Sequence, residues 1–286
     1  MIKALLRLGD GLSSGRPWLR SVVKKIQLGL IQAGFPLEAD GMFGRGTLNA
    51  IKAFQSSVGL EESGIFDPGS WTKLAPHLEA ATGEREARIR EMLVRFRGDL
   101  DWVHERESHS GRPYWPGGVS GATLDPGVDL GHASSETIEE LYSPLLTQAQ
   151  MKALRLVYGI KGEDARTALH ALPDLAAIRI SREQAAELMP YAAKPYWDGI
   201  CRRFPALARK DTLPTVQTVL LSLAYNRGVF NRYLEPLRDL LTAKSWNEAA
   251  DRIASMQQSH QLHGIRIRRR QEAMLIRAEL EFDVSS

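Results

Sequence analysis

The stretch WVHERESHSG, residues 102–111, contains the side-chain types that proteins use to bind metals and to transfer protons. A helical zinc pair needs two histidines four positions apart, about 40° around the helix. His104 and His109 are five positions apart, which places them roughly 140° apart at about 100° per residue. The spacing therefore departs from the helical zinc signature, and we expect neither a metal nor another cofactor.

The segment before this stretch predicts how its carboxyl groups are placed. Apolar residues recur in steps of four and three, as on one face of a helix, at Ile89, Leu93, Phe96, Leu100 and Val103. The next step of four reaches Glu107, whereas Glu105 points about 200° away from it. A carboxyl group at the end of a buried face loses solvent, which raises its pKa and suits a general acid. The alternative is that Glu107 emerges into water where the helix ends.

The next segment, SGRPYWPGGVSGATLDPGVDLGHA, is dense in glycine, proline and aromatic residues. Such a composition is typical of a short hairpin or an irregular lip beside a cleft. The segment resembles the active-site hairpin of the lysozyme-like muramidases, particularly that of the pesticin-type branch. The matching residues are Trp115, Pro116, Gly117, Gly118, Ser120, Gly121, Thr123, Gly127, Asp129, Leu130 and Gly131.

This resemblance implies three catalytic residues. Glu107 takes the place of the catalytic glutamate, Thr123 that of the threonine and Asp129 that of the aspartate. Glu105 is the second choice for the acid, because the loop that follows the glutamate is shorter than the resemblance leads us to expect. Asp125 stands where the pattern has a glycine, so it is a further carboxylate whose role the sequence leaves open.

The chemistry that the resemblance implies is cleavage of the β-1,4 bond between N-acetylmuramic acid and N-acetylglucosamine. One carboxylic acid protonates the leaving oxygen, and an ionised carboxylate supports the oxocarbenium-like transition state or activates water. A hydroxyl such as that of Thr123 orients this water. The separation of the two carboxyl groups decides whether configuration is retained, and similarity to the phage lysozymes implies inversion.

Residues 19–74 contain an internal repeat. GMFGRGTL from Gly41 and GIFDPGSW from Gly64 align at an offset of 23, which matches Thr47 with Ser70. We expect each copy to be a glycine turn followed by a helix that Thr47 or Ser70 caps. The segment resembles the three-helix peptidoglycan-binding domain that often accompanies cell-wall hydrolases. The resemblance rests on Ile26, Gln27, Gly34, Asp40, Gly41, Phe43, Gly44, Thr47, Ala50, Phe54, Gln55, Gly59, Leu60, Gly64, Trp71 and Leu74.

The two resemblances predict the fold class and the domains. We expect a mainly α (α+β) chain in which a peptidoglycan-binding domain spans residues 1–75 and a linker spans residues 76–86. A lysozyme-like muramidase domain with a small β-hairpin lip then spans residues 87–286. The segment APHLEAATGEREA is interpreted as linker because it has no apolar period.

Two later segments resemble phage lysozymes as well. LLSLAYNRGVF contains Asn226 and Gly228, which we interpret as a helix C-cap in preference to residues of the cleft. HGIRIRRRQEAM contains Arg268, Arg269 and Glu272, for which we expect structural ion pairs.

Composition limits the classes of function. The 286 residues, 43% of them hydrophobic, suffice for a full core and for two domains. The only cysteine, Cys201, cannot form an intramolecular disulfide, and we expect it in the core. A net charge of +3 is too small for a dedicated nucleic-acid binder. No apolar run has the length of a membrane-spanning helix, and the first residues lack the apolar region of a signal peptide.

Together these features predict a modular phage endolysin that binds bacterial peptidoglycan, acts as a monomer and lyses the cell. We expect it to be stored in the host cytoplasm and to reach the cell wall or periplasm once a separate protein permeabilises the membrane. The basic C-terminal helix is a candidate for contact with an anionic outer-membrane surface. That hypothesis predicts that deletion of residues 264–286 abolishes killing from outside.

Three alternatives stay open at the level of the sequence. A lytic transglycosylase would cut the same bond with one glutamate and would not need Thr123 or Asp129. A wall-binding or virion protein would carry an inactive hydrolase domain. A zinc amidase or peptidase would use histidines such as His132 and would lose activity in a chelator.

Overall fold

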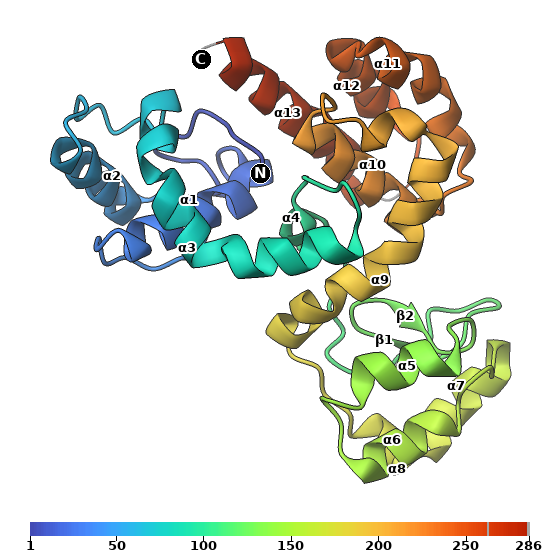
Figure 1. Ribbon diagram of the computed structural model, residues 1–286. Coiled ribbons are helices and arrows are strands. Elements are labelled where there is room, and N and C mark those ends of the chain that lie inside the picture. Colours follow the sequence, from blue (N-terminus) through green and yellow to red (C-terminus); the bar gives the residue numbers. More distant parts are fainter. Residues whose placement is uncertain (262, 285–286) are drawn as a thin grey trace. The chain divides into compact units, whose positions relative to one another are not determined.

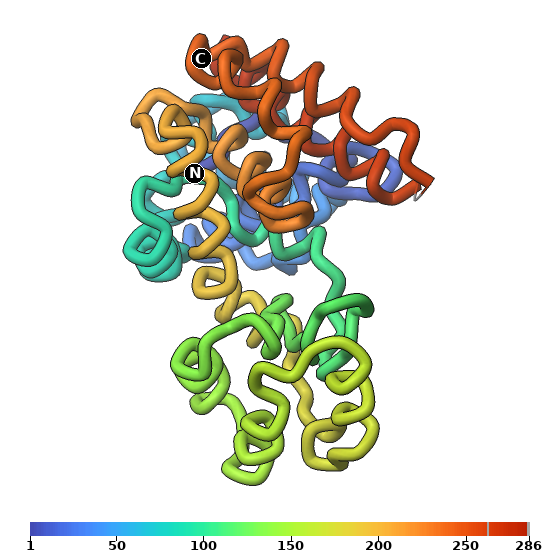
Figure 2. Tube along the Cα trace, turned by 90° about the vertical axis from the view of Figure 1, so that its right-hand side faces the viewer, coloured from blue at the N-terminus to red at the C-terminus, as the bar shows by residue number. Residues whose placement is uncertain are grey.

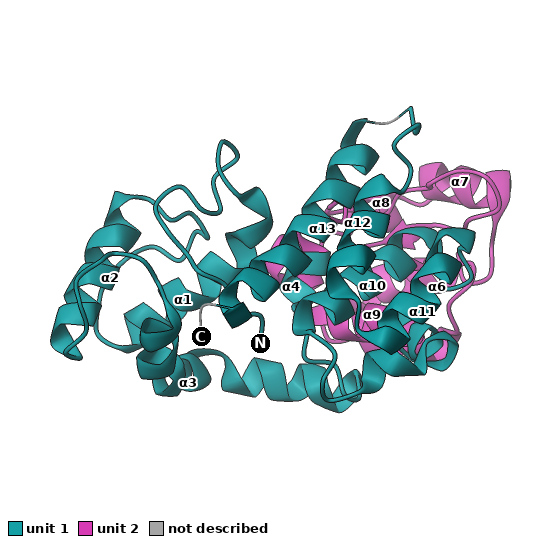
Figure 3. Cartoon of the chain, turned by 90° about the horizontal axis from the view of Figure 1, so that it is seen from above, with its two compact units in different colours: residues 1–103, 196–286 teal, residues 104–195 magenta. Residues whose placement is uncertain are grey.

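The computed structural model describes residues 1–261 and 263–284. The fold is mainly helical with one two-stranded antiparallel sheet among these residues, so the predicted fold class is confirmed (Figure 1). The chain forms two compact units: unit 1 contains residues 1–103 and 196–286, and unit 2 contains residues 104–195 (Figure 3). The chain enters unit 2 in the green part of the trace and leaves it in the yellow part (Figure 2).

Unit 1 is built from helices alone in its described part. They are η1 (Pro17–Leu19), α1 (Arg20–Gln32), α2 (Arg45–Ser57), α3 (Pro68–Met92), η2 (Pro205–Ala208), α10 (Pro214–Arg227), η3 (Arg232–Leu237), α11 (Arg238–Ala243), α12 (Trp246–Ser255) and α13 (His263–Val284). Two more helices contribute residues to both units, namely α4 (Leu100–His104) and α9 (Arg182–Arg203).

The internal repeat of α1 to α3 is organised by two buried glutamines. In each copy, the amide oxygen accepts from the N–H of the turn glycine, and the amide nitrogen donates to a hydroxyl in the next helix: Gln27 with Gly41 and Thr47, and Gln55 with Gly64 and Ser70. Each buried amide thereby fixes one turn to the helix after it, because an unpaired buried amide would be costly.

The predicted capping role of the two hydroxyls is wrong. Thr47 and Ser70 lie three residues inside their helices, whose N-cap residues are Gly44 and Asp67. Asp67 already accepts from the N–H of Ser70 at 2.8 Å, which is the bond that an N-cap side chain makes.

Residues 76–86, predicted to be a linker, are helical and lie inside α3. The helix extends past the repeat because Leu78 and Ile89 are buried and because Lys25 of α1 donates to Glu86 at 2.9 Å. The compact units also differ from the predicted domains, so the boundaries between a binding and a catalytic part stay a prediction.

The apolar stripe over residues 89–103 is buried as predicted, but it does not form one helix. α3 ends at Met92 and α4 begins at Leu100. In the interval, the side chain of Gln217 from α10 accepts from the N–H of Arg97 at 2.7 Å. A side chain from a distant helix thus replaces a helical hydrogen bond, an effect that local periodicity does not contain.

The C-terminal helix α13 is part of the core of unit 1. Arg269 and Glu272 are fully buried and lie 2.8 Å apart, and Ser222 of α10 donates to Glu272 at 2.7 Å. The predicted structural ion pairs are confirmed. Deletion of residues 264–286 would remove this buried pair. A loss of killing after the deletion would therefore report a loss of the fold, and contact with the outer membrane stays a prediction.

Three further predictions can be compared with the structure. Gly228 is the C-cap of α10 with φ 82°, and its N–H donates to the carbonyl of Ala224 at 2.7 Å, so the predicted cap is confirmed. Cys201 is only half-buried, contrary to the expected core position, and burial raises the pKa of its thiol to about 12. None of the helices in the described residues has the length and apolar character needed to cross a membrane.

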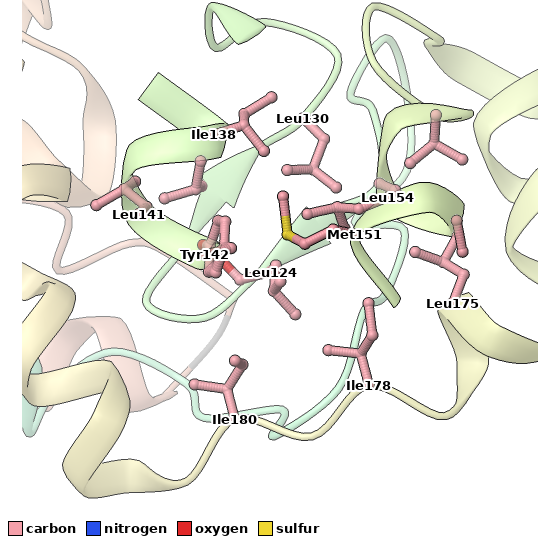
Figure 4. Close-up of a cluster of buried hydrophobic side chains, with 14 of the residues drawn as sticks. Leu124, Leu130, Ile138, Leu141, Tyr142, Met151, Leu154, Leu175, Ile178 and Ile180 are labelled. Atoms are coloured by element: carbon pink, nitrogen blue, oxygen red, sulfur yellow. The ribbon is translucent and has the colours of Figure 1, made fainter. Parts of the chain in front are cut away.

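Unit 2 combines short helices with the hairpin. Its complete elements are β1 (Thr123–Leu124), β2 (Val128–Asp129), α5 (Ser135–Tyr142), α6 (Gln148–Arg155), α7 (Gly162–Ala171) and α8 (Pro173–Ala176). Local caps start the helices: Ser134 accepts from the N–H of Thr137, and Thr147 forms a capping box with Gln150. The core between strands and helices includes Leu124, Leu130, Ile138, Leu141, Tyr142, Met151, Leu154, Leu175, Ile178 and Ile180 (Figure 4).

Candidate active site

The hairpin of unit 2 places three side chains in a row across its strands. Thr123 of β1 pairs with Asp129 of β2, and Tyr114 is joined to Thr123 by two backbone hydrogen bonds of 3.0 and 2.7 Å. Residues directly opposite each other in antiparallel strands point to the same face. Tyr114, Thr123 and Asp129, here called the cross-strand row, therefore share one face of the hairpin.

The carboxylate of Asp129 is fixed by the backbone around it. Its Oδ1 accepts from the N–H groups of Gly121 and Gly131, each at 2.9 Å. Both positions need glycine, because a Cβ on Gly121 would lie 2.4 Å from the nitrogen of Gly131 and a Cβ on Gly131 would lie 2.7 Å from the carbonyl oxygen of Ile160. The two glycines of the matched pattern thus have a physical reason: they let two backbone N–H groups approach one oxygen that carries negative charge.

The other groups near Asp129 are a hydroxyl and an imidazole. Thr123 is only 5% exposed, and its Oγ1 lies 3.5 Å from the carbonyl oxygen of Gly121. His132 Nε2 lies 3.2 Å from the carbonyl oxygen of Val119 and 4.0 Å from Asp129 Oδ2. The hydroxyl and the second carboxylate oxygen are thus held more loosely than Asp129 Oδ1.

Glu107 lies in a turn that follows α4, because this helix ends at His104. Its N–H donates to the carbonyl of His104 at 3.0 Å, and its side chain is half-buried. The prediction that Glu107 continues a buried helical face is therefore wrong, because the helix ends before this residue. Glu105, the second choice for the acid, is also half-buried and lies 3.8 Å from the guanidinium of Arg106.

The charge of Glu107 acts on Tyr114, a member of the cross-strand row. The pKa of its phenol is raised above the ordinary value, first by burial and then by the negative charges of Asp125, Glu107 and Asp129. The negative charges of all three carboxylates therefore act on the same phenol. Tyr114 was not expected from the sequence, in which its only signal is its position next to Trp115 of the matched pattern.

Two further residues of the segment shape the loops of the site. The indole N–H of Trp115 donates to the carbonyl of Ser120 at 3.0 Å, and the guanidinium of Arg166 lies 5.9 Å from the centre of its ring. Asp125 is almost completely buried and faces the loop that follows Glu107. Neither residue belongs to the cross-strand row.

Two protein families match this chain. Residues 20–74 match the peptidoglycan binding domain, and residues 99–247 match the family described as the bacterial toxin homologue of phage lysozyme, C-terminal part. The second match covers more than half of the chain. The chain belongs to this lysozyme-like family. Both resemblances found in the sequence are thereby confirmed, and together the matches support a peptidoglycan hydrolase with a wall-binding region before the lysozyme-like region.

Among solved structures, the chain is similar to the endolysin of Burkholderia phage AP3, with 21% identity over 96% of this chain and 99% of that chain. The TM-score is 0.22, so the two whole chains do not superpose. No curated protein matches the chain.

Proposed function

We propose that this chain is a phage endolysin that hydrolyses the β-1,4 bond between N-acetylmuramic acid and N-acetylglucosamine and so lyses the bacterial cell. The lysozyme-like family supports cleavage of the glycan, and the peptidoglycan-binding family supports the bacterial wall as the polymer. Binding to an insoluble polymer raises the local concentration of the catalytic part there without any change in its site.

The observation that carries the proposal is the neighbourhood of Tyr114. Thr123 and Asp129 lie on the same face of the hairpin as this residue, and the charge of Glu107 reaches its phenol. The charges of Glu107 and Asp129 thus act on the same phenol, which supports these two residues as the pair of carboxyl groups that glycoside hydrolysis uses.

In the proposed mechanism, Glu107 gives its proton to the bridging oxygen as the bond to the anomeric carbon breaks. A water molecule oriented by the Thr123 hydroxyl attacks the anomeric carbon and passes its proton to the carboxylate of Asp129. Asp129 uses Oδ1 to accept two backbone N–H groups, which leaves Oδ2 for this proton. The expected outcome is inversion, with a new reducing end on N-acetylmuramic acid.

The test is product analysis of purified peptidoglycan in H₂¹⁸O with the wild type, Glu107→Gln and Glu140→Gln. Glu140 is the matched control, since it is an exposed glutamate of α5 in the same unit. We expect ¹⁸O at the reducing N-acetylmuramic acid from the wild type and the control, and a fall of about 10³-fold for Glu107→Gln.

Other outcomes separate the alternatives. Anhydro ends without ¹⁸O would identify a lytic transglycosylase, and activity that disappears in a chelator would identify a metal-dependent enzyme. A wild type that binds the wall but releases no fragments would identify a wall-binding protein.

Storage in the host cytoplasm before lysis is a further part of the proposal. Fractionation of infected cells before and after lysis tests it.

A further inference from the structure

Asp125 lies immediately after β1, is 1% exposed, and is engaged on both carboxylate oxygens. Oδ2 accepts from the N–H of Gly111 at 2.5 Å and lies 3.0 Å from Nδ1 of His109. Oδ1 accepts from the N–H of Ser110 at 3.3 Å. These partners are three consecutive residues that begin two positions after Glu107, so the loop that follows Glu107 folds around a single buried anion.

The core of unit 2 fixes Asp125 itself. The hydroxyl of Tyr142, from α5, donates to the carbonyl oxygens of Asp125 and Leu124 at 3.0 and 3.3 Å. Tyr142 is fully buried beside Leu124 (Figure 4). Burial, with a contribution from Asp125, raises the pKa of the Tyr142 phenol, so it stays a neutral donor. The carboxylate therefore extends from a backbone that does not move independently of the core.

The far end of the loop is tied to the same core. The carbonyl of Gly111 accepts from the N–H of Ile180 at 2.9 Å, and Ile180 is a buried member of the hydrophobic cluster. Gly111 adopts φ 67°, which lets the chain turn between this bond and the bond to Asp125. The loop from Glu107 thus reaches the core through residues 109–111, and Asp125 contacts all three.

We propose that Asp125 is a positioning residue: its buried charge fixes the loop that begins at Glu107 relative to the strand that carries Thr123. The inference rests on the proposed function, in which Glu107 is the acid. Asp125 is not the proton donor or acceptor of the reaction, because both its oxygens are committed to the loop.

The test compares full-length Asp125→Ala and Asp125→Asn with Asp174→Asn, an exposed aspartate of α8 that serves as the matched control. kcat and KM are measured on solubilised glycan strands, together with amide hydrogen exchange of the peptide that spans residues 105–114. We expect kcat of Asp125→Ala to fall about 10²-fold with little change in KM, because displacement of a catalytic group by about 1 Å costs that much. Exchange at residues 110 and 111 should rise in the same variant.

Asp125→Asn should recover part of kcat, because its amide oxygen still accepts one N–H, and Asp174→Asn should match the wild type. Wild-type kcat in Asp125→Ala, or a loss of kcat without faster exchange, would overturn the inference. If the alanine variant does not fold, the asparagine variant decides, and unchanged kcat and exchange in it overturn the inference. An active Glu107→Gln would overturn the proposed function instead, while the exchange readout of Asp125 would still stand.

Discussion

The two compact units hold their carboxylates in different ways. In unit 1, the ammonium group of Lys25 lies 2.9 Å from Glu86 and 3.4 Å from Asp99. In unit 2, the carboxylates of Asp125 and Asp129 each accept two backbone N–H groups. An ion pair cancels a charge, whereas backbone dipoles hold a carboxylate in place and leave its net charge available.

Stability and the proposed chemistry therefore depend on different contacts in the two units. The Lys25 pairs of unit 1 join parts of the chain far apart in sequence, because Lys25 of α1 lies beside Glu86 of α3 and Asp99 before α4. Carboxylates of unit 2 are fixed within a few residues of the proposed catalytic groups. We therefore expect loss of a unit 1 charge to affect unfolding and loss of a unit 2 contact to affect turnover.

The largest effect is expected for Lys25→Met. Removal of one partner of a buried ion pair leaves Glu86 and Asp99 without their cation, which typically costs about 3–5 kcal/mol in the free energy of unfolding. Urea denaturation measures this cost, and Lys24→Met is the control, since Lys24 is the exposed neighbour on the same helix. A loss below about 1 kcal/mol would contradict the stabilising role of the unit 1 pairs.

Gly121→Ala tests the backbone contacts of Asp129. The new methyl group would overlap the nitrogen of Gly131 and press on the Asp129 carboxylate. We expect a loss of about 1–3 kcal/mol in stability, as for other overpacked sites, and a clear fall in kcat. Calorimetry and turnover of glycan strands measure both quantities. Gly46→Ala is the control, because a Cβ at that position meets no atom within 4 Å; full activity in Gly121→Ala would refute the geometry of the site.

Tyr114→Phe should affect turnover while stability stays close to that of the wild type. The hydroxyl is half-buried, and the negative charges of Asp125, Glu107 and Asp129 act on it. We expect it to donate to a charged group once glycan is bound, and such a hydrogen bond contributes about 1.5–3 kcal/mol. We expect kcat to fall about tenfold or more, with a melting temperature near that of the wild type. A variant with a lower melting temperature but normal turnover would show that Tyr114 stabilises the fold and has no part in the reaction.

The smallest expected effect is a pH dependence of the stability that the ion pair between Lys25 and Asp99 contributes. Burial alone would raise the pKa of Asp99, but Lys25 and the N–H of Trp102 outweigh burial and lower it. In the wild type, this carboxylate stabilises the fold above its unfolded pKa of about 3.9, and the contribution disappears as pH falls through the lower folded pKa. In Lys25→Met, we expect burial to raise the pKa of Asp99 in the folded state. Protonation of Asp99 at lower pH would then remove the destabilisation that its unpaired buried charge causes. The stability difference between wild type and Lys25→Met should thus narrow between pH 7 and pH 4, as urea titrations at both values measure.

Local patterns in the sequence predicted much of this protein. The fold class and both family resemblances are confirmed, because glycine turns, apolar spacing and the hairpin pattern are local in the chain. Arg269 and Glu272 were correctly expected to pair, since three positions along one helix bring side chains together. The choice of Glu107, Thr123 and Asp129 as catalytic residues was also made from the sequence and stays a prediction.

Other features depend on contacts between distant residues, which no local period contains. The helix expected across residues 89–103 breaks because a glutamine of α10 binds the backbone in between. The expected linker is helical because α1 pairs with it, and Tyr114 joins the site only through its register with Thr123. The order of the residues fixes which carboxyl and hydroxyl groups stand at the candidate positions. Which groups surround them depends on the packed fold, because burial and long-range hydrogen bonds arise only when distant segments pack together.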